Sequence, residues 1–212
     1  MKKKISFFIP NFLMGGAENV YVNLANEAIK KQYNVEFVVA KRIGPLKSKI
    51  NKKIKIYSLN KEKVRYCLLG LKNYLQEKKP NYFFSAMTHC NLIALIASKL
   101  SNFKGNIYLK ECNNFSTKHK NDLMKYFIFK FLINFFYKFS TKIICLSHGV
   151  RKDFIFYFPR FKKKTKVIYN PVDILKIKKL SKKSILLKKD LKSKKIIVSV
   201  GRLVKQKNYI NL

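Results

Sequence analysis

Residues 5–18, ISFFIPNFLMGGAE, decide the fold of this chain. The apolar run Ile5–Ile9 predicts a buried β-strand, and Pro10 ends it. The paired glycines Gly15 and Gly16 then begin a helical pattern. A strand, a glycine-containing turn and a helix are the opening unit of an α/β domain, in which ligands lie beyond the carboxyl ends of the strands.

The same alternation continues along the chain. Further strands are predicted at Val35–Ala40, Ile54–Tyr57, Tyr82–Ala86, Ile107–Leu109, Ile143–Leu146 and Val167–Tyr169. Helical patterns separate most of them, at Ala17–Lys31, Glu62–Lys78, Asn91–Leu100, Asp122–Phe139 and Val150–Phe156. This order predicts an α/β fold with a Rossmann-like parallel sheet and helices on both faces.

A second unit of the same kind begins near the end of the sequence. Ile196–Val200 predicts a buried strand, which Gly201 and a short basic loop follow. Residues 174–193 are rich in lysine, leucine and serine, which indicates a partly helical crossing between domains. We therefore expect one domain over residues 1–173, a crossing over 174–193 and the first strand and turn of a truncated domain over 194–212.

The composition is strongly basic, with 47 Lys and Arg against 10 Asp and Glu and a formal net charge of +37. Such a charge favours a polyanionic partner, either nucleic acid or an anionic membrane surface, although solvated lysines explain it as well. No aromatic-basic RNA-binding pattern, zinc module or recognition helix is present in the sequence. A basic nucleic-acid-binding protein therefore stays an alternative, and we expect no specific nucleic acid.

The cysteines, histidines and apolar stretches indicate a metal-free, cytoplasmic chain. The four cysteines contain no C-x-x-C pair, and three histidines give no zinc spacing. The basic start and its apolar run resemble a signal peptide, but Pro10 breaks the run, so we favour a first strand. The most apolar stretch, Tyr126–Phe139, is too interrupted by polar residues to span a membrane.

The stretch Asp122–Phe139 leaves two interpretations open. Its phenylalanines recur at helical spacing, with Lys130, Asn134 and Lys138 on what we expect to be the opposite stripe. It is either an ordinary core helix or a contact at the inner face of an anionic membrane, where lysines meet the headgroups.

Two turns carry candidate binding residues. Gly15 and Gly16 let a ligand approach free backbone N–H groups at a helix start, although a tight turn with Glu18 beside the helix dipole explains them equally well. Arg202 and Lys207 flank the second turn and are suited to binding a phosphate, or are surface cations.

Four motifs in order resemble those of retaining glycosyltransferases of family 4, which have the two-domain GT-B fold. They are Gly15-Gly16-Ala17-Glu18, Leu146-Ser147, Asn170-Pro171-Val172-Asp173 and Val200-Gly201-Arg202-Leu203 with Lys207-Asn208. The resemblance implies an N-terminal domain that binds the acceptor and a C-terminal domain that binds a nucleotide-sugar donor. The enzyme would transfer the sugar to a surface polysaccharide or a lipid-linked glycan, with no further cofactor and no metal.

The resemblance also implies roles for particular residues. Gly15, Gly16, Arg202 and Lys207 would bind the donor diphosphate. Loops 87–91 and 110–114 would line the acceptor side, with Glu18, Asn91, Glu111 and Asn113 as candidate contacts. No catalytic residue is assigned.

One donor-side motif of the family, E-x7-E, is absent from these 212 residues. We therefore expect this chain to be inactive by itself. A non-catalytic domain that docks onto a partner is a further alternative.

Overall fold

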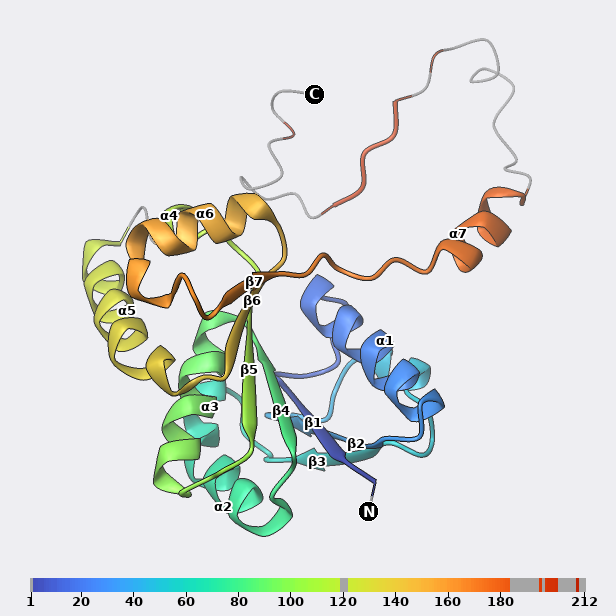
Figure 1. Ribbon diagram of the computed structural model, residues 1–212. Helices are drawn as coiled ribbons and strands as arrows, with labels where there is room; N and C mark the ends of the chain where they lie inside the picture. The colour runs from blue at the N-terminus through green and yellow to red at the C-terminus, as the bar shows by residue number, and fades with distance from the viewer. Residues whose placement is uncertain (1, 119–121, 184–194, 196, 202–208, 210–212) are drawn as a thin grey trace. The chain divides into compact units, whose positions relative to one another are not determined.

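The structure is a computed structural model that describes residues 2–118, 122–183, 195, 197–201 and 209. Its sheet has seven parallel strands in the order β3-β2-β1-β4-β5-β6-β7 (Figure 1). The strands are β1 (Lys4–Ile9), β2 (Asn34–Val39), β3 (Lys55–Ser58), β4 (Tyr82–Ala86), β5 (Asn106–Glu111), β6 (Lys142–Cys145) and β7 (Thr165–Val167).

Helices connect the strands, as the alternation predicted. They are α1 (Gly16–Lys30), α2 (Leu68–Lys78), α3 (Thr88–Leu100), α4 (Phe115–Lys118), α5 (Leu123–Phe136), α6 (His148–Tyr157) and α7 (Ile174–Ser181). Short 3₁₀ turns are η1 (Pro45–Lys49), η2 (Val64–Cys67), η3 (Tyr137–Phe139) and η4 (Pro159–Phe161). No helix among the described residues is long and apolar enough to cross a membrane.

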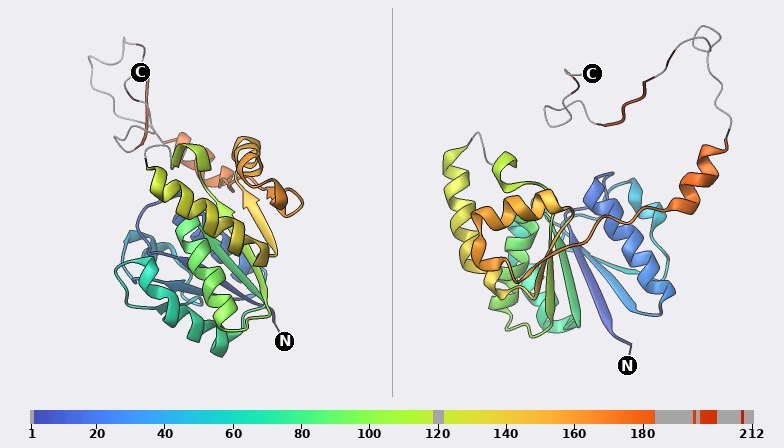
Figure 2. Two further views of the ribbon diagram at one scale, coloured as in Figure 1. Left: turned by 90° about the vertical axis from the view of Figure 1, so that its left-hand side faces the viewer. Right: turned by 45° about the horizontal axis from the view of Figure 1, so that its top comes forward.

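The sheet is buried on both faces because its strands alternate between two apolar cores. In β1, Phe7 and Ile9 belong to the core beneath α1, whereas Phe8 belongs to the core beneath α2, α3 and α5. Figures 1 and 2 show α1 on one face of the sheet and these three helices on the other. Each fully buried side chain of this size contributes about 1.5–3 kcal/mol. The predicted Rossmann-like sheet with helices on both faces is confirmed.

A row of aromatic rings ties four neighbouring strands together on the α1 face. The Phe7 ring centroid lies 5.6 Å from that of Phe37 and 5.3 Å from that of Phe84. Tyr108 continues the row, stacked on Phe84 at 4.9 Å. Cross-strand aromatic pairs of this kind fix the register of a sheet, and hence the loops at its edge.

The chain divides into two compact units, Met1–Pro171 and Val172–Leu212. Helix α7 lies within the predicted crossing. Residues 197–200, the described part of the strand predicted at Ile196–Val200, have no strand structure, and Ile197 and Val200 are 83% and 89% exposed, so the division into crossing and truncated domain stays a prediction. An apolar run forms a stable strand only when neighbouring strands pair with it.

Candidate functional site

The candidate site lies at the carboxyl edge of the sheet, where the strand order reverses. The chain passes from β1 to β2 and β3 on one side of β1, and then returns to β4 on the other side. The connections after β1 and β4 therefore diverge, and ligands of open α/β sheets bind in the crevice that this reversal creates. Gly15 and Gly16 follow β1, and Met87 follows β4.

The start of α1 leaves its backbone N–H groups without a side-chain cap. Gly15 is the N-cap residue, with extended backbone angles, and Gly16 begins the helix exposed. A Cβ atom at Gly16 would meet nothing within 4 Å, whereas one at Gly15 would lie 2.0 Å from Glu18 Oε2. The Glu18 carboxylate thus folds back over the turn, so an anion that binds there must displace it.

Met87 adopts a backbone conformation that is rare for a residue with a side chain. Its φ is 76°, and its N–H donates to the carbonyl of Lys110 at 3.1 Å. A non-glycine residue in this region costs about 1–3 kcal/mol, which the surrounding structure must offset. The turn between β4 and α3 is therefore held at the reversal point by β5, a feature that the sequence did not indicate.

A buried network fixes the end of β5 against α3 and η3. The Glu111 carboxylate accepts hydrogen bonds from Asn91 Nδ2 at 2.9 Å, Thr88 Oγ1 at 3.0 Å and the Tyr137 hydroxyl at 2.5 Å. Burial, and then the Glu111 charge, raise the pKa of Tyr137, so its hydroxyl stays protonated and donates.

The network corrects the predicted placement of two acceptor candidates. Asn91 and Glu111 lie in α3 and β5, not in loops, and are only 0% and 5% exposed. Glu111 follows Ile107 and Leu109 on the same face of β5, because alternate residues of a strand share a face. The side chains of Asn91 and Glu111 hold the carboxyl edge of the sheet in place, whereas Asn113 lies exposed in the bend after β5.

Lys110 connects two of the motifs at this edge. Its side chain, on the other face of β5, is buried, and its Nζ donates to Asn170 Oδ1 at 2.8 Å. The Nζ also lies 5.7 Å from the centroid of the Tyr21 ring on α1. Burial lowers the pKa of Lys110, and it raises the pKa of the neighbouring Cys112 thiol to about 11. The end of β5 and the segment after β7 therefore meet beside α1.

The connection after β6 completes the edge. Ser147 caps α6 by accepting a hydrogen bond from the Val150 N–H at 3.1 Å, and His148 is exposed with its ring 6.2 Å from that of Tyr169. Asp153 of α6 accepts the Phe115 N–H at 2.6 Å, which ties the start of α4 to α6.

Arg202 and Lys207 lie outside the described residues, so their role in binding the donor diphosphate stays a prediction. A pocket of about 570 Å³ lies at the opposite, amino edge of the sheet, lined by residues such as Asn81 and Asn106. None of the predicted site residues lines that pocket. In the described part of the chain, no group of three or more His, Cys, Asp or Glu side chains is arranged to hold a metal.

The sequence pattern of Glycosyltransferase Family 4 matches residues 14–175, and the chain belongs to this family. The match spans the first turn, the Glu111 network and the Asn170 motif.

Two curated relatives come from Campylobacter jejuni. One, a GalNAc-alpha-(1->4)-GalNAc-alpha-(1->3)-diNAcBac-PP-undecaprenol alpha-1,4-N-acetyl-D-galactosaminyltransferase, is 30% identical over 181 residues, which cover 79% of this chain and 46% of the relative. The other, an N-acetylgalactosamine-N,N'-diacetylbacillosaminyl-diphospho-undecaprenol 4-alpha-N-acetylgalactosaminyltransferase, is 32% identical over 126 residues, 59% of this chain and 33% of the relative. The chain thus spans less than half the length of the curated relatives it matches.

Solved structures share the fold at low identity. Anabaena Alr3699/HepE in complex with UDP-glucose has a TM-score of 0.62 at 18% identity, over 81% of this chain and 45% of that one. The lipopolysaccharide outer core galactosyltransferase WaaB has a TM-score of 0.56 at 19% identity, over 81% and 46%. These neighbours support the Rossmann-like half of a GT-B fold.

Proposed function

We propose that residues 1–171 form the acceptor-side domain of a retaining glycosyltransferase, which transfers a sugar from a nucleotide-diphosphate donor to a lipid-linked glycan. The observation that carries this proposal is the family match over residues 14–175, which includes the turn at Gly15 and Gly16, the turn at Met87 and the Glu111 network. The two Campylobacter relatives are named for acceptors linked to undecaprenol through a diphosphate, which supports the acceptor class.

In this proposal the edge residues bind and orient but do not react. The Gly15 N–H donates to the Leu13 carbonyl at 2.7 Å, so a phosphate oxygen is bound by the start of α1 at Gly16, which has no side-chain cap, and Gly15 leaves room for its approach. Arg202 and Lys207 neutralise the departing diphosphate from the donor side. The hydrogen bond between Lys110 and Asn170 fixes a part of the chain that lies, in sequence, between the glycine turn and the two basic residues. In this proposal the protein works in the cytoplasm, at the inner face of the membrane, and we expect no turnover from the 212 residues alone.

Acceptor binding tests the proposal. The chain is titrated with a water-soluble, short-prenyl diphosphate-linked glycan, and amide chemical shifts are followed by NMR. We expect the largest changes at the loops after β1, β4 and β5. Asn113→Ala, at the exposed acceptor candidate in the bend after β5, should keep the fold and weaken binding. Shift changes confined to the amino edge of the sheet, or equal binding by Asn113→Ala, would contradict the assignment.

Activity is tested with a fusion of residues 1–171 to the donor-side half of the 30%-identical relative. We expect transfer with retained anomeric configuration, measured by NMR of the product, and no turnover by the 212-residue chain. Turnover by that chain, or an inverted product, contradicts the proposal.

A further inference from the structure

Helix α5 is apolar on its outer side as well as on its inner side. Ile133 is buried in the core, and Phe129 and Phe136 pack against that core half-buried. The outer side has six large apolar residues that are between 48% and 74% exposed: Leu123, Met124, Phe127, Ile128, Phe131 and Phe135. We call these six residues the α5 surface. The outward face of a helix in a soluble protein is normally polar, and exposed apolar patches mark interaction sites.

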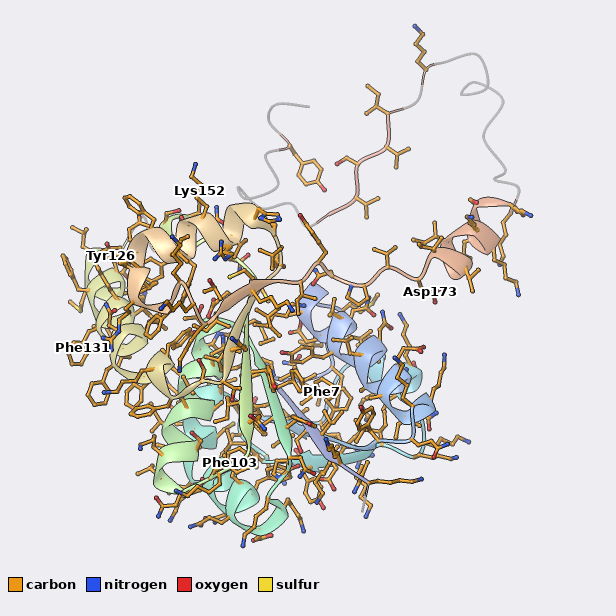
Figure 3. All side chains as sticks on the ribbon, viewed as in Figure 1. Phe7, Phe103, Tyr126, Phe131, Lys152 and Asp173 are labelled. Carbon is orange, nitrogen blue, oxygen red and sulfur yellow. The ribbon has the colours of Figure 1, made fainter. Side chains whose placement is uncertain are left out.

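The α5 surface continues onto α6 through touching aromatic rings. The ring centroids of Phe127 and Tyr126 are 5.3 Å apart, and Tyr126 lies 6.1 Å from Tyr157 of α6. Phe156, 77% exposed, contacts Tyr157 at 5.1 Å. Figure 3 shows Phe131 on the side of α5 away from the sheet, and Figure 2 shows α5 as the outermost helix of its layer. The apolar area therefore spans two helices.

Lysines border this apolar area, and they outnumber the acidic residues there. Lys138 Nζ lies 4.7 Å from the centroid of the Phe135 ring, and Lys130 Nζ lies 5.4 Å from that of Tyr126. Over residues 122–139 one acidic residue, Asp122, faces three lysines, and it pairs with Lys125 at 2.6 Å. Long lysine side chains beside apolar surface can bury their stems and extend their charges to an interface.

We propose that the α5 surface is the site at which this protein docks onto an anionic lipid membrane, with its phenylalanines at the acyl boundary and Lys130 and Lys138 at the headgroups. Charge decides the partner, because two copies of a chain with a net charge of +37 repel each other, whereas anionic lipid attracts it. This goes beyond the proposed transfer reaction, since it concerns membrane binding in the absence of any donor.

The position of α5 fits a membrane-linked substrate. Strands β5 and β6 run parallel, so the helix that connects them starts at the carboxyl edge and ends at the amino edge. The first half of α5, which contains Leu123 and Phe127, therefore lies toward the edge that carries Glu111 and Asn113. The course of α5 can be followed in Figure 1. Docking through α5 brings the candidate site close to the lipid surface.

Fluorescence tests the proposal directly, because the sequence contains no tryptophan. Phe131→Trp gives a single reporter on the α5 surface, and Leu69→Trp gives a matched reporter on α2, where Leu69 is likewise 69% exposed. Each variant is mixed with phosphatidylcholine vesicles with or without phosphatidylglycerol. We expect a blue shift and quenching by brominated lipid for the reporter at position 131, with phosphatidylglycerol present, and neither at position 69. Equal behaviour of the two reporters would overturn the proposal.

Vesicle sedimentation separates apolar docking from charge alone. Phe127→Ser, Phe131→Ser and Phe135→Ser together should lower partitioning at least about tenfold. The control Leu24→Ser, Leu69→Ser and Leu100→Ser removes three exposed apolar side chains from other helices at the same net charge, and should change partitioning less than about twofold. Unchanged partitioning of the first variant, with its circular dichroism intact, refutes the proposal. So does a parent chain that is dimeric by light scattering and becomes monomeric in that variant.

Discussion

Helices α1 and α5 have nearly the same length, 15 and 14 residues, yet their outer faces differ completely. The outer side of α1 carries polar residues such as Asn19, Glu27 and Lys30, with Leu24 only 39% exposed. The outer side of α5 is a stripe of phenylalanine, leucine, isoleucine and methionine. Each helix buries its inner side in one of the two cores that cover the sheet. The difference between them therefore lies in what their outer sides meet. The helix beside the candidate diphosphate turn faces water with polar residues, whereas the helix on the opposite face of the sheet presents the apolar surface that we propose docks onto a membrane.

The largest expected effect distinguishes the two sides of α5. Ile133→Ala should lower the free energy of unfolding by about 2–5 kcal/mol, because Ile133 is 0% exposed and its removal leaves a cavity. Phe131→Ala, at a site 69% exposed, should change it by no more than about 0.5 kcal/mol. Urea unfolding measures both values. A large loss for Phe131→Ala would mean that the outer side also belongs to the core, and the contrast with α1 would fail.

The sequence predicted this contrast only in part. Helical spacing correctly predicted one long apolar helix over Asp122–Phe139, but it placed Lys130, Asn134 and Lys138 on the stripe opposite the phenylalanines. In the structure Lys138 lies over Phe135, because residues three apart are neighbours on a helix surface. The polar stripe thus borders the exposed apolar one. Which phenylalanines are buried depends on which side of the helix packs into the core. The sequence of a helix that is apolar nearly all round does not determine that side.

The sheet was more readily predicted than the site. Strands such as β1 and β4 were found within a residue of their bounds, because apolar runs between turn residues are strong local signals. Glu111 was assigned to a loop because its charge is unusual for a buried strand, and its partners Asn91 and Tyr137 are distant in the sequence. The positive φ of Met87 has no local signal either, since neither glycine nor asparagine marks the position.

Two buried tyrosines allow the second comparison between the α1 and α5 regions. Tyr21 of α1 donates to the neutral Ser85 carbonyl at 2.9 Å, whereas Tyr137, at the end of α5, donates to the Glu111 carboxylate. Tyr137→Phe should therefore cost about 1.5–3 kcal/mol and Tyr21→Phe about 0.5–1.5 kcal/mol, because hydrogen bonds to charged groups are stronger. Chemical denaturation of the two single variants gives the difference. Equal costs would show that the Glu111 network does not hold a charge.

Alkaline titration gives the third comparison. Burial raises the pKa of the Cys145 thiol from 9.0 to about 12, with Glu111 adding to the effect. The folded chain keeps this proton where the unfolded chain loses it, so the stabilisation is complete below pH 9.0 and is lost as the pH rises through about 12. The loss is at most about 1.4 kcal/mol for each pH unit.

Cys145→Ala should flatten the decline of unfolding free energy above pH 9.0. Lys110, on the α1 face, acts in the opposite direction, because burial lowers its pKa below 10.5 and stability rises as the pH approaches that value. Lys110→Met should therefore steepen the same decline. Denaturant titrations at several alkaline pH values test both variants, and parallel curves for Cys145→Ala and the parent chain would refute the assignment.

The smallest expected effects concern how the two helices begin. Helix α5 is capped by Asp122, whose side chain accepts the Lys125 N–H at 2.9 Å, whereas Gly15 gives α1 no side-chain cap. Asp122→Ala should lower the free energy of unfolding by about 1 kcal/mol. Gly16→Ala should raise it by about 0.4–1 kcal/mol, because a Cβ there meets nothing within 4 Å and alanine restricts the unfolded chain. Thermal melts of the two variants should thus shift in opposite directions. A destabilised Gly16→Ala would show that the turn before α1 requires glycine for its own conformation. Glycine at position 16 would then serve the fold, and not the close approach of a phosphate.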